Sequence, residues 1–317
     1  MSGHFNELLA AEAFVQVVNT GSFAAAAKLR NENPSSVSRA ISQLEHHLGV
    51  RLLIRTTRTV RISEAGETYL RYARHMLDHQ QQARDALAQL NTGRPRGLVR
   101  VSMPVVVGEY LLADRLKEFH AEFPEVELQV DLSNKTVQLV EEGIDLAFRF
   151  GPLADSSLRA KRISTIWRHV YASPAYLEQH GEPKHPSELA NHQCIAFSQR
   201  GEVKEWEIWP PEGGESQKYR VNNWLTCSSP MMVVKAIIAG VGLGRSAYWM
   251  TSAALARGDL VQVLKDWRCD DPVRGGVPIH LVYPPGPSGQ VSLKVRVVAQ
   301  FMERVLKEAF DAPGPEF

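Results

Sequence analysis

The sequence has no apolar run of the 18 or so residues that a membrane-spanning helix needs. Its first apolar stretch, residues 8–18, is interrupted by Glu12 and Gln16. This stretch also has no basic leader and no cleavage site, so it does not resemble a secretory signal. We therefore expect a cytoplasmic protein with no membrane partner.

Cysteine is scarce. The chain of 317 residues has three cysteines, Cys194, Cys227 and Cys269, which lie far apart and form no CxxC pair. An odd count without a framework suits a reducing compartment and excludes a disulfide scaffold. We expect neither a metal site nor a cofactor.

An excess of charge of one sign is also missing, because 36 basic residues nearly balance 35 acidic ones. This balance excludes general binding of polyanions by the whole molecule. Residues 51–61, however, contain Arg51, Arg55, Arg58 and Arg61 and no acidic residue. Such a patch on a nearly neutral protein predicts a confined polyanion site, with a solvated arginine-rich loop as the alternative.

The first 49 residues have the apolar spacing of three helices. The first is expected to end near Gly21, and Ser22 is expected to cap a second helix that ends at Leu29. Asn33 is expected to cap a third helix with Pro34 in its first turn, where proline is tolerated. Gly49 ends the third helix, whose buried stripe is Val37, Ile41, Leu44 and Leu48.

The opposite face of the third helix is polar, and it fits the major groove of double-stranded DNA. Arg39 can grip guanine bidentately, although it could instead contact phosphate or pair with Glu45. Gln43 can reach a base or a phosphate. Ser35, Ser36 and Ser38 can donate hydrogen bonds to DNA, unless one of them only starts the helix.

The arginine-rich segment lies between two short apolar runs, residues 52–54 and 60–62, which predict a hairpin wing. Arg55, Thr56 and Arg58 are placed at its tip. A minor groove has a negative potential that favours arginine, so we expect these residues to flank or enter one.

A long helix is predicted from Ser63, its cap, to about Asn91. Its apolar seam has an average spacing of 3.5 residues, which is the coiled-coil period; it is formed by Tyr69, Ala73, Met76, Gln80, Ala83, Leu87 and Leu90. So narrow a stripe favours dimerisation with a second chain over an ordinary surface helix. Residues 93–97 are read as a linker.

From Leu98 to Phe150, strand and helix patterns alternate, which predicts a parallel sheet with right-handed crossovers. The strands are expected at 99–103, 126–132, 144–150, 167–172 and 279–283, and the helices at 105–119, 137–142, 175–180, 230–239 and 291–309. A second α/β lobe inserted into the first would account for this order. Ligands of such sheets bind in the crevice at the carboxyl ends of the strands.

Several motifs along the chain resemble those of the LysR-type transcriptional regulators. They are Gly21-Ser22-Phe23-x-x-Ala26-Ala27-x-Leu29, Pro34-Ser35-Ser36-Val37-Ser38-Arg39-x-Ile41-x-x-Leu44-Glu45, Leu48-Gly49-Val50-x-Leu52-Leu53-x-Arg55-Thr56-Thr57-Arg58, Glu64-Ala65-Gly66, Asp145–Leu153, Ala172–Leu177 and Gly258–Val261. The resemblance implies a winged helix-turn-helix, a dimerising linker helix and a two-lobed effector domain like a periplasmic binding protein. It also implies homodimers or homotetramers, and RNA polymerase as a further partner.

The resemblance assigns four segments. They are a winged helix-turn-helix DNA-binding domain at 1–63, a linker helix at 64–92, a hinge at 93–97 and an effector-binding domain at 98–310. Lobe I of that domain is about 98–163 and 270–310, and lobe II is about 164–269. The chain departs from the family in the polar turn before Pro34 and in residues 245–249, which are usually apolar, so an unusual cleft floor is expected.

Effector contacts are expected where strands end or helices begin. Hydroxyl groups and free N–H groups at such places can hold a carboxylate, which predicts a small anionic organic effector. The predicted contacts are Ser102, Met103, Ser133, Phe150, Phe197, Ser198, Thr226 and Ser228. For each serine, a simple helix cap is an equally good interpretation.

Three other functions compete with a sequence-specific, effector-controlled regulator of transcription. The run Gly240-x-Gly242-x-Gly244 follows a predicted helix and does not complete a nucleotide-binding motif, so an enzyme is not expected. A plain solute receptor would leave the basic wing unexplained. An architectural DNA binder would not need so large a C-terminal part.

Overall fold

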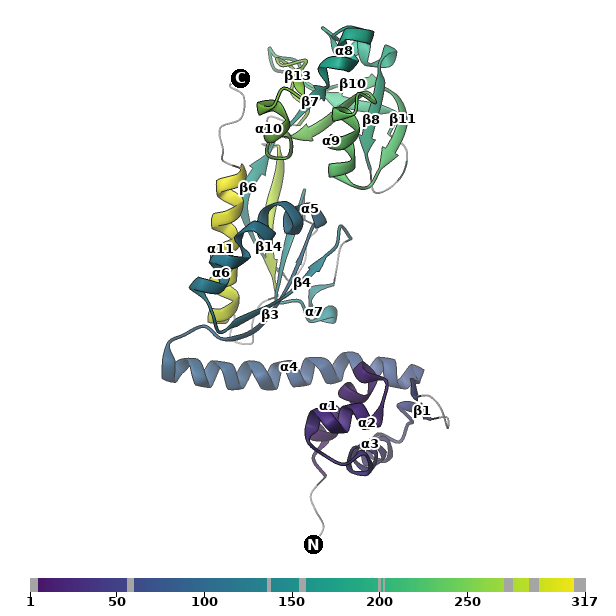
Figure 1. Cartoon of the computed structure of the whole chain (residues 1–317), viewed down its shortest axis with the longest axis vertical. Helices are drawn as coiled ribbons and strands as arrows, with labels where there is room; N and C mark the ends of the chain where they lie inside the picture. The colour runs from purple at the N-terminus through teal and green to yellow at the C-terminus, as the bar shows by residue number, and fades with distance from the viewer. Residues whose placement is uncertain are drawn as a thin grey trace. The chain divides into compact units, whose positions relative to one another are not determined.

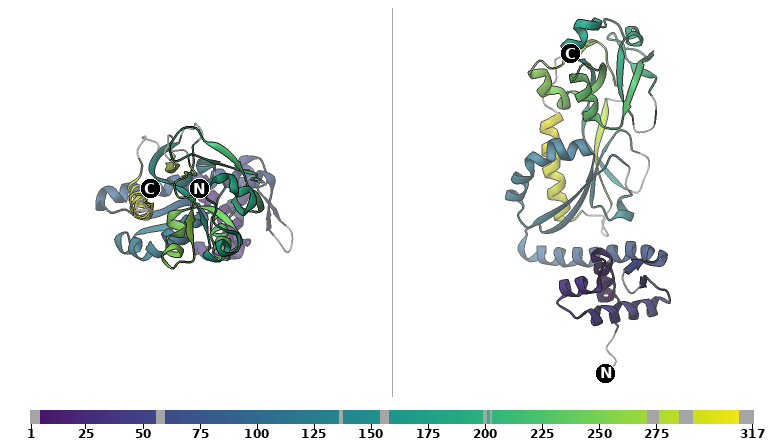
Figure 2. Two further views of the ribbon diagram at one scale, coloured as in Figure 1. Left: turned by 90° about the horizontal axis from the view of Figure 1, so that it is seen from above. Right: turned by 45° about the vertical axis from the view of Figure 1, so that its right-hand side comes forward.

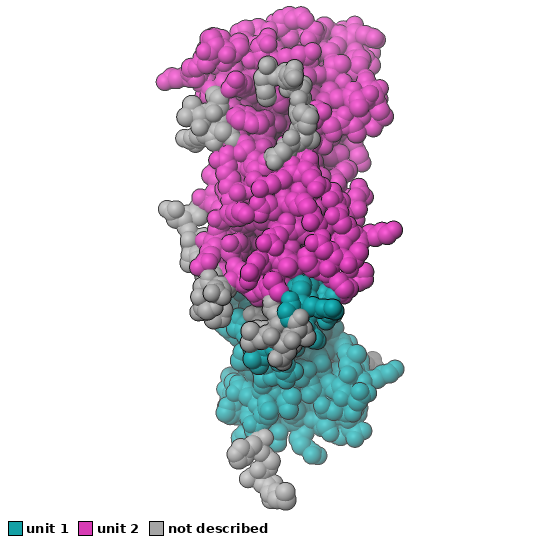
Figure 3. All heavy atoms as spheres, turned by 90° about the vertical axis from the view of Figure 1, so that its left-hand side faces the viewer, with its two compact units in different colours: residues 1–98, 125–127, 137–144 teal, residues 99–124, 128–136, 145–317 magenta. Residues whose placement is uncertain are grey.

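The computed structural model describes residues 5–55, 60–135, 138–153, 158–198, 201, 203–270, 276–284 and 291–310. It divides into two compact units, coloured separately in Figure 3. The first comprises residues 1–98, 125–127 and 137–144, and the second comprises 99–124, 128–136 and 145–317. Within the described residues, no helix is both long and apolar enough to cross a membrane.

The N-terminal head is built from α1 (Glu7–Thr20), α2 (Phe23–Arg30) and α3 (Pro34–Leu48), followed by the wing strands β1 (Leu53–Arg55) and β2 (Val60–Ile62) (Figure 1). The Ser22 hydroxyl accepts a hydrogen bond from the Ala25 amide, which confirms its capping role. The head core contains the predicted stripe residues Val37, Ile41 and Leu44, each fully buried.

The polar turn between α2 and α3 is held by Arg30 and Asn31. Asn31 has φ 52° and ends α2, and its backbone N–H points to the carbonyl oxygens of Ala27 and Lys28. The Arg30 guanidinium is 3.1 Å from the Glu12 carboxylate and 2.9 Å from that of Glu32. These contacts fix the angle at which α3 leaves the turn.

The long helix α4 (Glu64–Thr92) begins where predicted, because the Ser63 hydroxyl accepts from the Gly66 amide at 3.0 Å. Gly66 packs directly against the wing: a Cβ atom there would lie 2.1 Å from the Leu52 carbonyl oxygen. The seam of α4 is used in two ways. Tyr69 and Ala73 pack into the head core, whereas Met76, Ala83 and Leu87 are exposed on the single chain.

One five-stranded sheet has the order β4-β3-β5-β14-β6. Its strands are β3 (Gly97–Met103), β4 (Val126–Leu132), β5 (Leu146–Phe150), β6 (Arg159–Ile166) and β14 (Val277–Tyr283). β3 and β5 are parallel, but β14 runs antiparallel to both β5 and β6. The parallel pairing of β3 and β5 agrees with the arrangement predicted for residues 98–150, and the whole sheet is mixed because β14 returns from the second lobe in the opposite direction.

Helices cover this first sheet. They are α5 (Val105–Val107), the π-helix η1 (Gly108–Leu112), the 3₁₀ turn η2 (Ala113–Arg115), α6 (Leu116–Glu122) and α11 (Leu293–Phe310). The short helix α7 (Leu139–Glu142) belongs to the first compact unit. α11 runs beside β6 and β14 in Figure 1 and in the right-hand view of Figure 2, and Phe301 packs edge-on against Phe119, with 5.1 Å between ring centroids. The single helix predicted at 105–119 is instead broken into four helical pieces. Gly108 lies against Leu132, where a Cβ atom would come within 2.2 Å.

The second sheet has the order β11-β8-β12-β7-β13, and all its strands lie between β6 and β14 in the chain. They are β7 (Arg168–Ala172), β8 (Gln193–Phe197), β11 (Asn222–Cys227), β12 (Leu243–Ala247) and β13 (Val261–Val263). A hairpin of β9 (Glu205–Ile208) and β10 (Gln217–Arg220), the helices α8 (Pro174–His180), α9 (Pro230–Ile238) and α10 (Tyr248–Ala256), and the 3₁₀ helix η3 (Pro186–Asn191) complete the lobe. This order confirms an inserted second lobe.

Both faces of the second sheet are buried. On β7, Val170 and Ala172 face one core, whereas Tyr171 faces the other. The glycine run Gly240-x-Gly242-x-Gly244 extends into β12 and serves this packing: a Cβ atom at Gly244 would lie 2.6 Å from Ile237 of α9. The run is a turn and a close strand–helix contact, which explains why it resembles a nucleotide loop only in part.

Candidate functional site

The polar face of α3 is open to solvent. Ser35, Ser36, Arg39 and Gln43 are exposed, and Ser38 is half-buried. Within the described part of the chain, Arg39 makes no hydrogen bond or ion pair. Its guanidinium is therefore available to a molecule outside the chain.

Glu45, on the same helix, fixes the wing to α3. One oxygen of its carboxylate accepts hydrogen bonds from the backbone amides of Leu52 and Leu53, at 2.8 and 3.0 Å. This contact explains why a glutamate ends the helical motif: it sets the distance between the recognition helix and β1.

The start of α3 differs slightly from the prediction. Asn33 occupies the N-cap position, but its side chain makes no capping hydrogen bond. Instead, its carbonyl oxygen accepts from the Ser36 and Val37 amides. The helix start is exposed at Pro34, Ser35 and Ser36, and the positive end of a helix dipole suits a phosphate.

The tip of the wing lies outside the described residues. This applies to Thr56, Arg58 and the side chain of Arg55. The strands that carry the tip are described and pair antiparallel, Leu53 with Ile62 and Arg55 with Val60. The roles of the three wing residues stay predictions.

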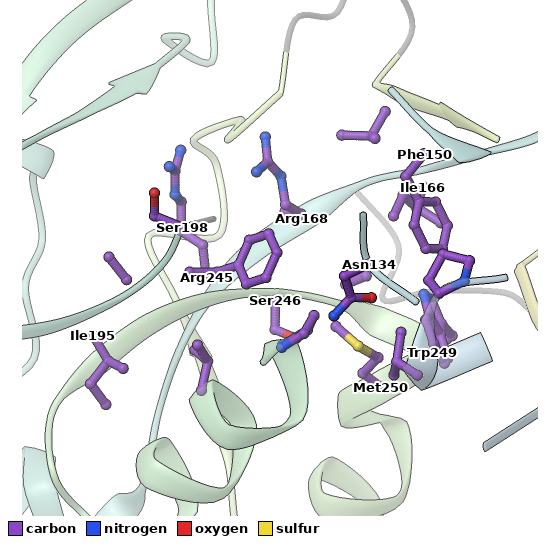
Figure 4. Close-up of a pocket in the computed structure, with 18 of the residues that line it drawn as sticks. Asn134, Phe150, Ile166, Arg168, Ile195, Ser198, Arg245, Ser246, Trp249 and Met250 are labelled. Carbon is purple, nitrogen blue, oxygen red and sulfur yellow. The ribbon is translucent and has the colours of Figure 1, made fainter. Parts of the chain in front are cut away.

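A cavity of about 570 Å³ lies in the second unit, between the residues of the two sheets (Figure 4). From the first lobe and the connection to the second it is lined by Pro104, Val106, Ser133, Asn134, Lys135, Arg149, Phe150, Ile166 and Val277. From the second lobe it is lined by Arg168, Ile195, Ala196, Phe197, Ser198, Trp206, Pro230, Val233, Arg245, Ser246, Ala247, Trp249 and Met250. Its volume is in the range of small-molecule sites.

The charge of this cavity is positive. Four cationic side chains line it, Lys135, Arg149, Arg168 and Arg245, and none of the described lining residues is acidic. In Figure 4, Arg168, Arg245 and Ser198 lie on one side of the view, and Phe150, Ile166 and Trp249 lie on the other. Among the labelled residues, the two arginines thus lie apart from these three large apolar or aromatic side chains.

Arg168 is neutralised within the chain. The Asp270 carboxylate is 3% exposed and accepts from the Arg168 backbone amide and Nε, both at 2.7 Å, and also from Nη2. Burial by itself would lower the pKa of the Arg168 guanidinium, but the Asp270 charge outweighs burial and raises it. This pair leaves Arg168 with little charge to offer a ligand.

Arg245 has no such partner. Its guanidinium carbon lies 4.9 Å from the ring centroid of Trp206, and it forms no ion pair with any described residue. Burial, together with the nearby Arg168 charge, lowers the pKa of Arg245 to about 10. The group still carries its proton at neutral pH, and it is a desolvated cation beside open space.

Four of the eight predicted effector residues line this cavity: Ser133, Phe150, Phe197 and Ser198. The other four do not. Ser102 and Met103 are fully buried in the first lobe, the Thr226 hydroxyl accepts from Asn223, and Ser228 precedes Ser229, which caps α9. The Ser133 hydroxyl also accepts from the Lys135 amide, as in a local turn.

The sequence analysis does not place the cationic residues that line this cavity. The polar run 245–249 was noted as unusual for the family, and it supplies Arg245, Ser246 and Trp249 to the lining. Arg168 and Trp206 gave no such signal, because only the pairing of distant strands brings them here. Among the described residues, no cluster of three or more His, Cys, Asp or Glu side chains could hold a metal ion.

Comparison with known proteins agrees with this arrangement. Residues 8–67 match the family described as bacterial regulatory helix-turn-helix protein, lysR family, and residues 92–307 match the LysR substrate binding domain. Together these matches cover most of the chain. The chain belongs to the LysR family of transcriptional regulators, with a helix-turn-helix DNA-binding part and an effector-binding part.

Relatives resemble it over nearly their whole length. An HTH-type transcriptional regulator of Xanthomonas campestris pv. campestris is 34% identical over 303 residues, covering 94% of this chain and 85% of the relative. The structure of CrgA, a LysR-type regulator from Neisseria meningitidis, is 30% identical with a TM-score of 0.57, covering 96% and 98% of the two chains. The Vibrio cholerae virulence activator AphB is 27% identical with a TM-score of 0.59, covering 93% and 98%.

Proposed function

We propose that this regulator binds specific promoter half-sites as a dimer or tetramer, and that a small anionic organic effector in the cavity controls its DNA binding. It would act in the cytoplasm, where it can meet DNA and RNA polymerase. Two observations together support the proposal. The polar face of α3 is exposed and its Arg39 has no partner among the described residues. The second unit contains a cavity lined by cationic side chains and, among the described residues, by no acidic one.

The DNA side of the proposal follows from the geometry of α3. One exposed helix face with Arg39, Gln43 and hydroxyl groups can lie in a major groove, where arginine reads guanine. Two heads in a dimer would contact half-sites about one helical turn apart, or a multiple of that. An exposed Leu87 on α4, 65% accessible in the single chain, supports pairing through this helix.

The proposed control of DNA binding by the effector follows from thermodynamic linkage between ligand binding and conformation. A ligand shifts an equilibrium only through different affinities for two states. A ligand held between two lobes satisfies this condition if closure of the lobes changes its contacts. The bound effector would then change the placement of the DNA-binding heads in the oligomer.

Footprinting on the promoter beside the protein's own gene, with and without candidate organic acids, tests both sides. We expect Arg39→Ala to weaken binding to the footprinted site by about 5- to 150-fold, which corresponds to about 1–3 kcal/mol. Arg257→Ala is the matched control, because Arg257 is exposed in the second lobe and pairs only with Asp259 among described residues. Unchanged affinity of Arg39→Ala would contradict the assignment of α3 as the reading helix.

The wing is tested by salt dependence. We expect Arg58→Ala to weaken binding to specific and unrelated DNA alike, and to reduce the slope of log affinity against log salt by about 1. A loss confined to the specific site would instead assign Arg58 to base reading.

A further inference from the structure

The guanidinium of Arg245 is the unusual feature of the cavity. One of its faces lies over the buried indole of Trp206, at 4.9 Å. Stacking of this kind leaves the N–H groups at the edge of the guanidinium plane free, and their fork matches a carboxylate. The carboxylate that influences the pKa of Arg245, that of Asp270, is already bound to Arg168.

Two more hydrogen-bond donors of the same cavity lack partners. The Ser246 side chain is 2% exposed, and its hydroxyl has no hydrogen-bond partner among the described residues. The Trp249 indole nitrogen is likewise buried without a partner in the described chain. Buried polar groups are normally paired, so the Ser246 hydroxyl and the Trp249 indole nitrogen are two polar groups of lining residues that the described chain leaves unsatisfied.

These donors lie where α10 begins. Its N-cap residue, Ala247, also lines the cavity and has no side chain that could accept from the first amides of the helix. The Arg245 guanidinium, two residues before the N-cap of this helix, is a cationic group on this side of the cavity and favours a negatively charged acceptor.

The rest of the lining describes the body of the ligand. Phe150, Ile166, Val233 and Met250 give an apolar wall, and Trp249 adds an aromatic one. Figure 4 shows Phe150, Ile166 and Trp249 grouped away from Arg245 and Ser198. The cavity volume of about 570 Å³ exceeds what a small inorganic anion fills.

We propose that Arg245 anchors the carboxylate of an organic acid whose apolar, ring-sized body occupies the Phe150–Ile166–Trp249 end of the cavity. This inference rests on the proposed function, because it names the effector class of the same site. It goes further by assigning one residue, absent from the predicted contacts, as the charge anchor. A competing view is that Arg245 only packs against Trp206 as part of the core.

The test uses the full-length protein and Arg245→Met, with Arg257→Met as the control. Isothermal titration would compare indole-3-acetate, phenylacetate and octanoate with the neutral indole-3-acetamide and phenylacetamide, and with acetate and inorganic phosphate. We expect at least one of the three apolar acids to bind at least about 10-fold more tightly than its amide, acetate or phosphate. Arg245→Met should lose that binding by at least about 10-fold, and Arg257→Met should keep it.

A second readout does not depend on the choice of acid. An uncompensated desolvated cation costs stability that a binding site tolerates. We therefore expect ligand-free Arg245→Met to melt about 2–4 °C higher than the wild-type protein. A lower melting temperature would show that Arg245 serves the packing of Trp206, and would overturn the inference.

Three titration results would also overturn it. They are equal affinity of an acid for the wild type and Arg245→Met, phosphate or acetate binding as tightly as the apolar acids, and no saturable binding of any apolar acid up to about 10 mM. The proposed function fails separately. If another anion shifts the promoter footprint equally in wild type and Arg245→Met, effector control stands and only the assignment of Arg245 falls.

Discussion

Arg39 and Arg245 are both arginines without an ion-pair partner among the described residues, but they lie in opposite surroundings. Arg39 is exposed on a helix face and retains its hydration. Arg245 lies over a buried tryptophan, where burial lowers its pKa. The first arrangement costs the fold almost nothing, whereas the second destabilises the fold until a counter-charge arrives.

The two regions can carry these groups because their cores differ. In the described residues, six of the fourteen buried residues of the head core are alanines, so its helices approach closely around a small core. The second lobe buries large side chains on both faces of a sheet, including Trp206 and Tyr171. A small core contributes little free energy of unfolding to offset the cost of a buried charge, so the candidate functional residues of the head lie on its surface. The larger lobe can place one inside.

The largest effect that would test this contrast is expected from Gly66→Ala. The added methyl group would collide with the Leu52 carbonyl at the joint of α4 and the wing. We expect the free energy of unfolding of the head to fall by about 3 kcal/mol, which is the upper end of the usual cost of overpacking. Hydrogen exchange of the α1 and α3 amides in the full-length protein would measure this loss.

Thr68→Ala is the control for that experiment, because Thr68 is exposed on the same helix. The free energy of unfolding that hydrogen exchange gives for this variant should differ from the wild-type value by no more than about 0.5 kcal/mol. If the α1 and α3 amides of Gly66→Ala exchanged at the wild-type rate, the head would accommodate the added methyl group more easily than its alanine-rich core indicates.

A smaller effect is expected from Leu87→Glu, which asks whether α4 belongs to the head alone or to a pair of chains. Burying one leucine contributes about 1.5–3 kcal/mol, so loss of this contact should raise the dimer dissociation constant about 10- to 100-fold. Analytical ultracentrifugation measures the constant. His79→Glu, at another exposed position of α4, should leave it nearly unchanged, and equal constants for all three proteins would assign dimerisation elsewhere.

The smallest effect concerns pH and the second lobe. Burial lowers the pKa of His169 and of His192 below the ordinary value of 6.5. Above about pH 6.5 both groups are neutral in the folded and unfolded chain, so they do not affect stability. Below it the unfolded chain takes up protons first, and stability falls as the pH decreases towards the folded pKa values.

Melting curves at about pH 7.5 and 5.5 would show this loss. The double variant His169→Gln with His192→Gln should have a smaller difference between the two pH values than the wild type. His120→Gln, at an exposed position of α6, is the control. An undiminished pH effect in the double variant would assign the loss of stability to other groups.

The head could be predicted almost completely from the sequence, because its determinants are local. Helix periodicity, the Ser22 and Ser63 caps and Gly49 fix its elements within a few residues of each other in the chain. The exposed face of α3 follows from the same periodicity, since residues opposite the Val37–Ile41–Leu44 stripe must face solvent.

The effector cavity could be predicted only in part, because its determinants are not local. Ser133 and Phe150 were placed by the rule that ligands bind beyond the ends of strands, and both line the cavity. Arg168 and Arg245 come from β7 and β12, which are neighbours in the sheet but lie far apart in the chain. β12 was not predicted as a strand, since its run Leu243–Ala247 contains a glycine and two polar residues.

The chain passes between the two sheets only where β6 leads into β7 and where the segment after Asp270 leads into β14. Arg168 begins β7 after the first passage, Asp270 precedes the second, and their ion pair joins the two. The two lobes are thus connected by two chain crossings, and the Arg168–Asp270 ion pair holds these crossings together. A change in the angle between the lobes would therefore act on the Arg168–Asp270 pair, whose two charges also influence the pKa of Arg245.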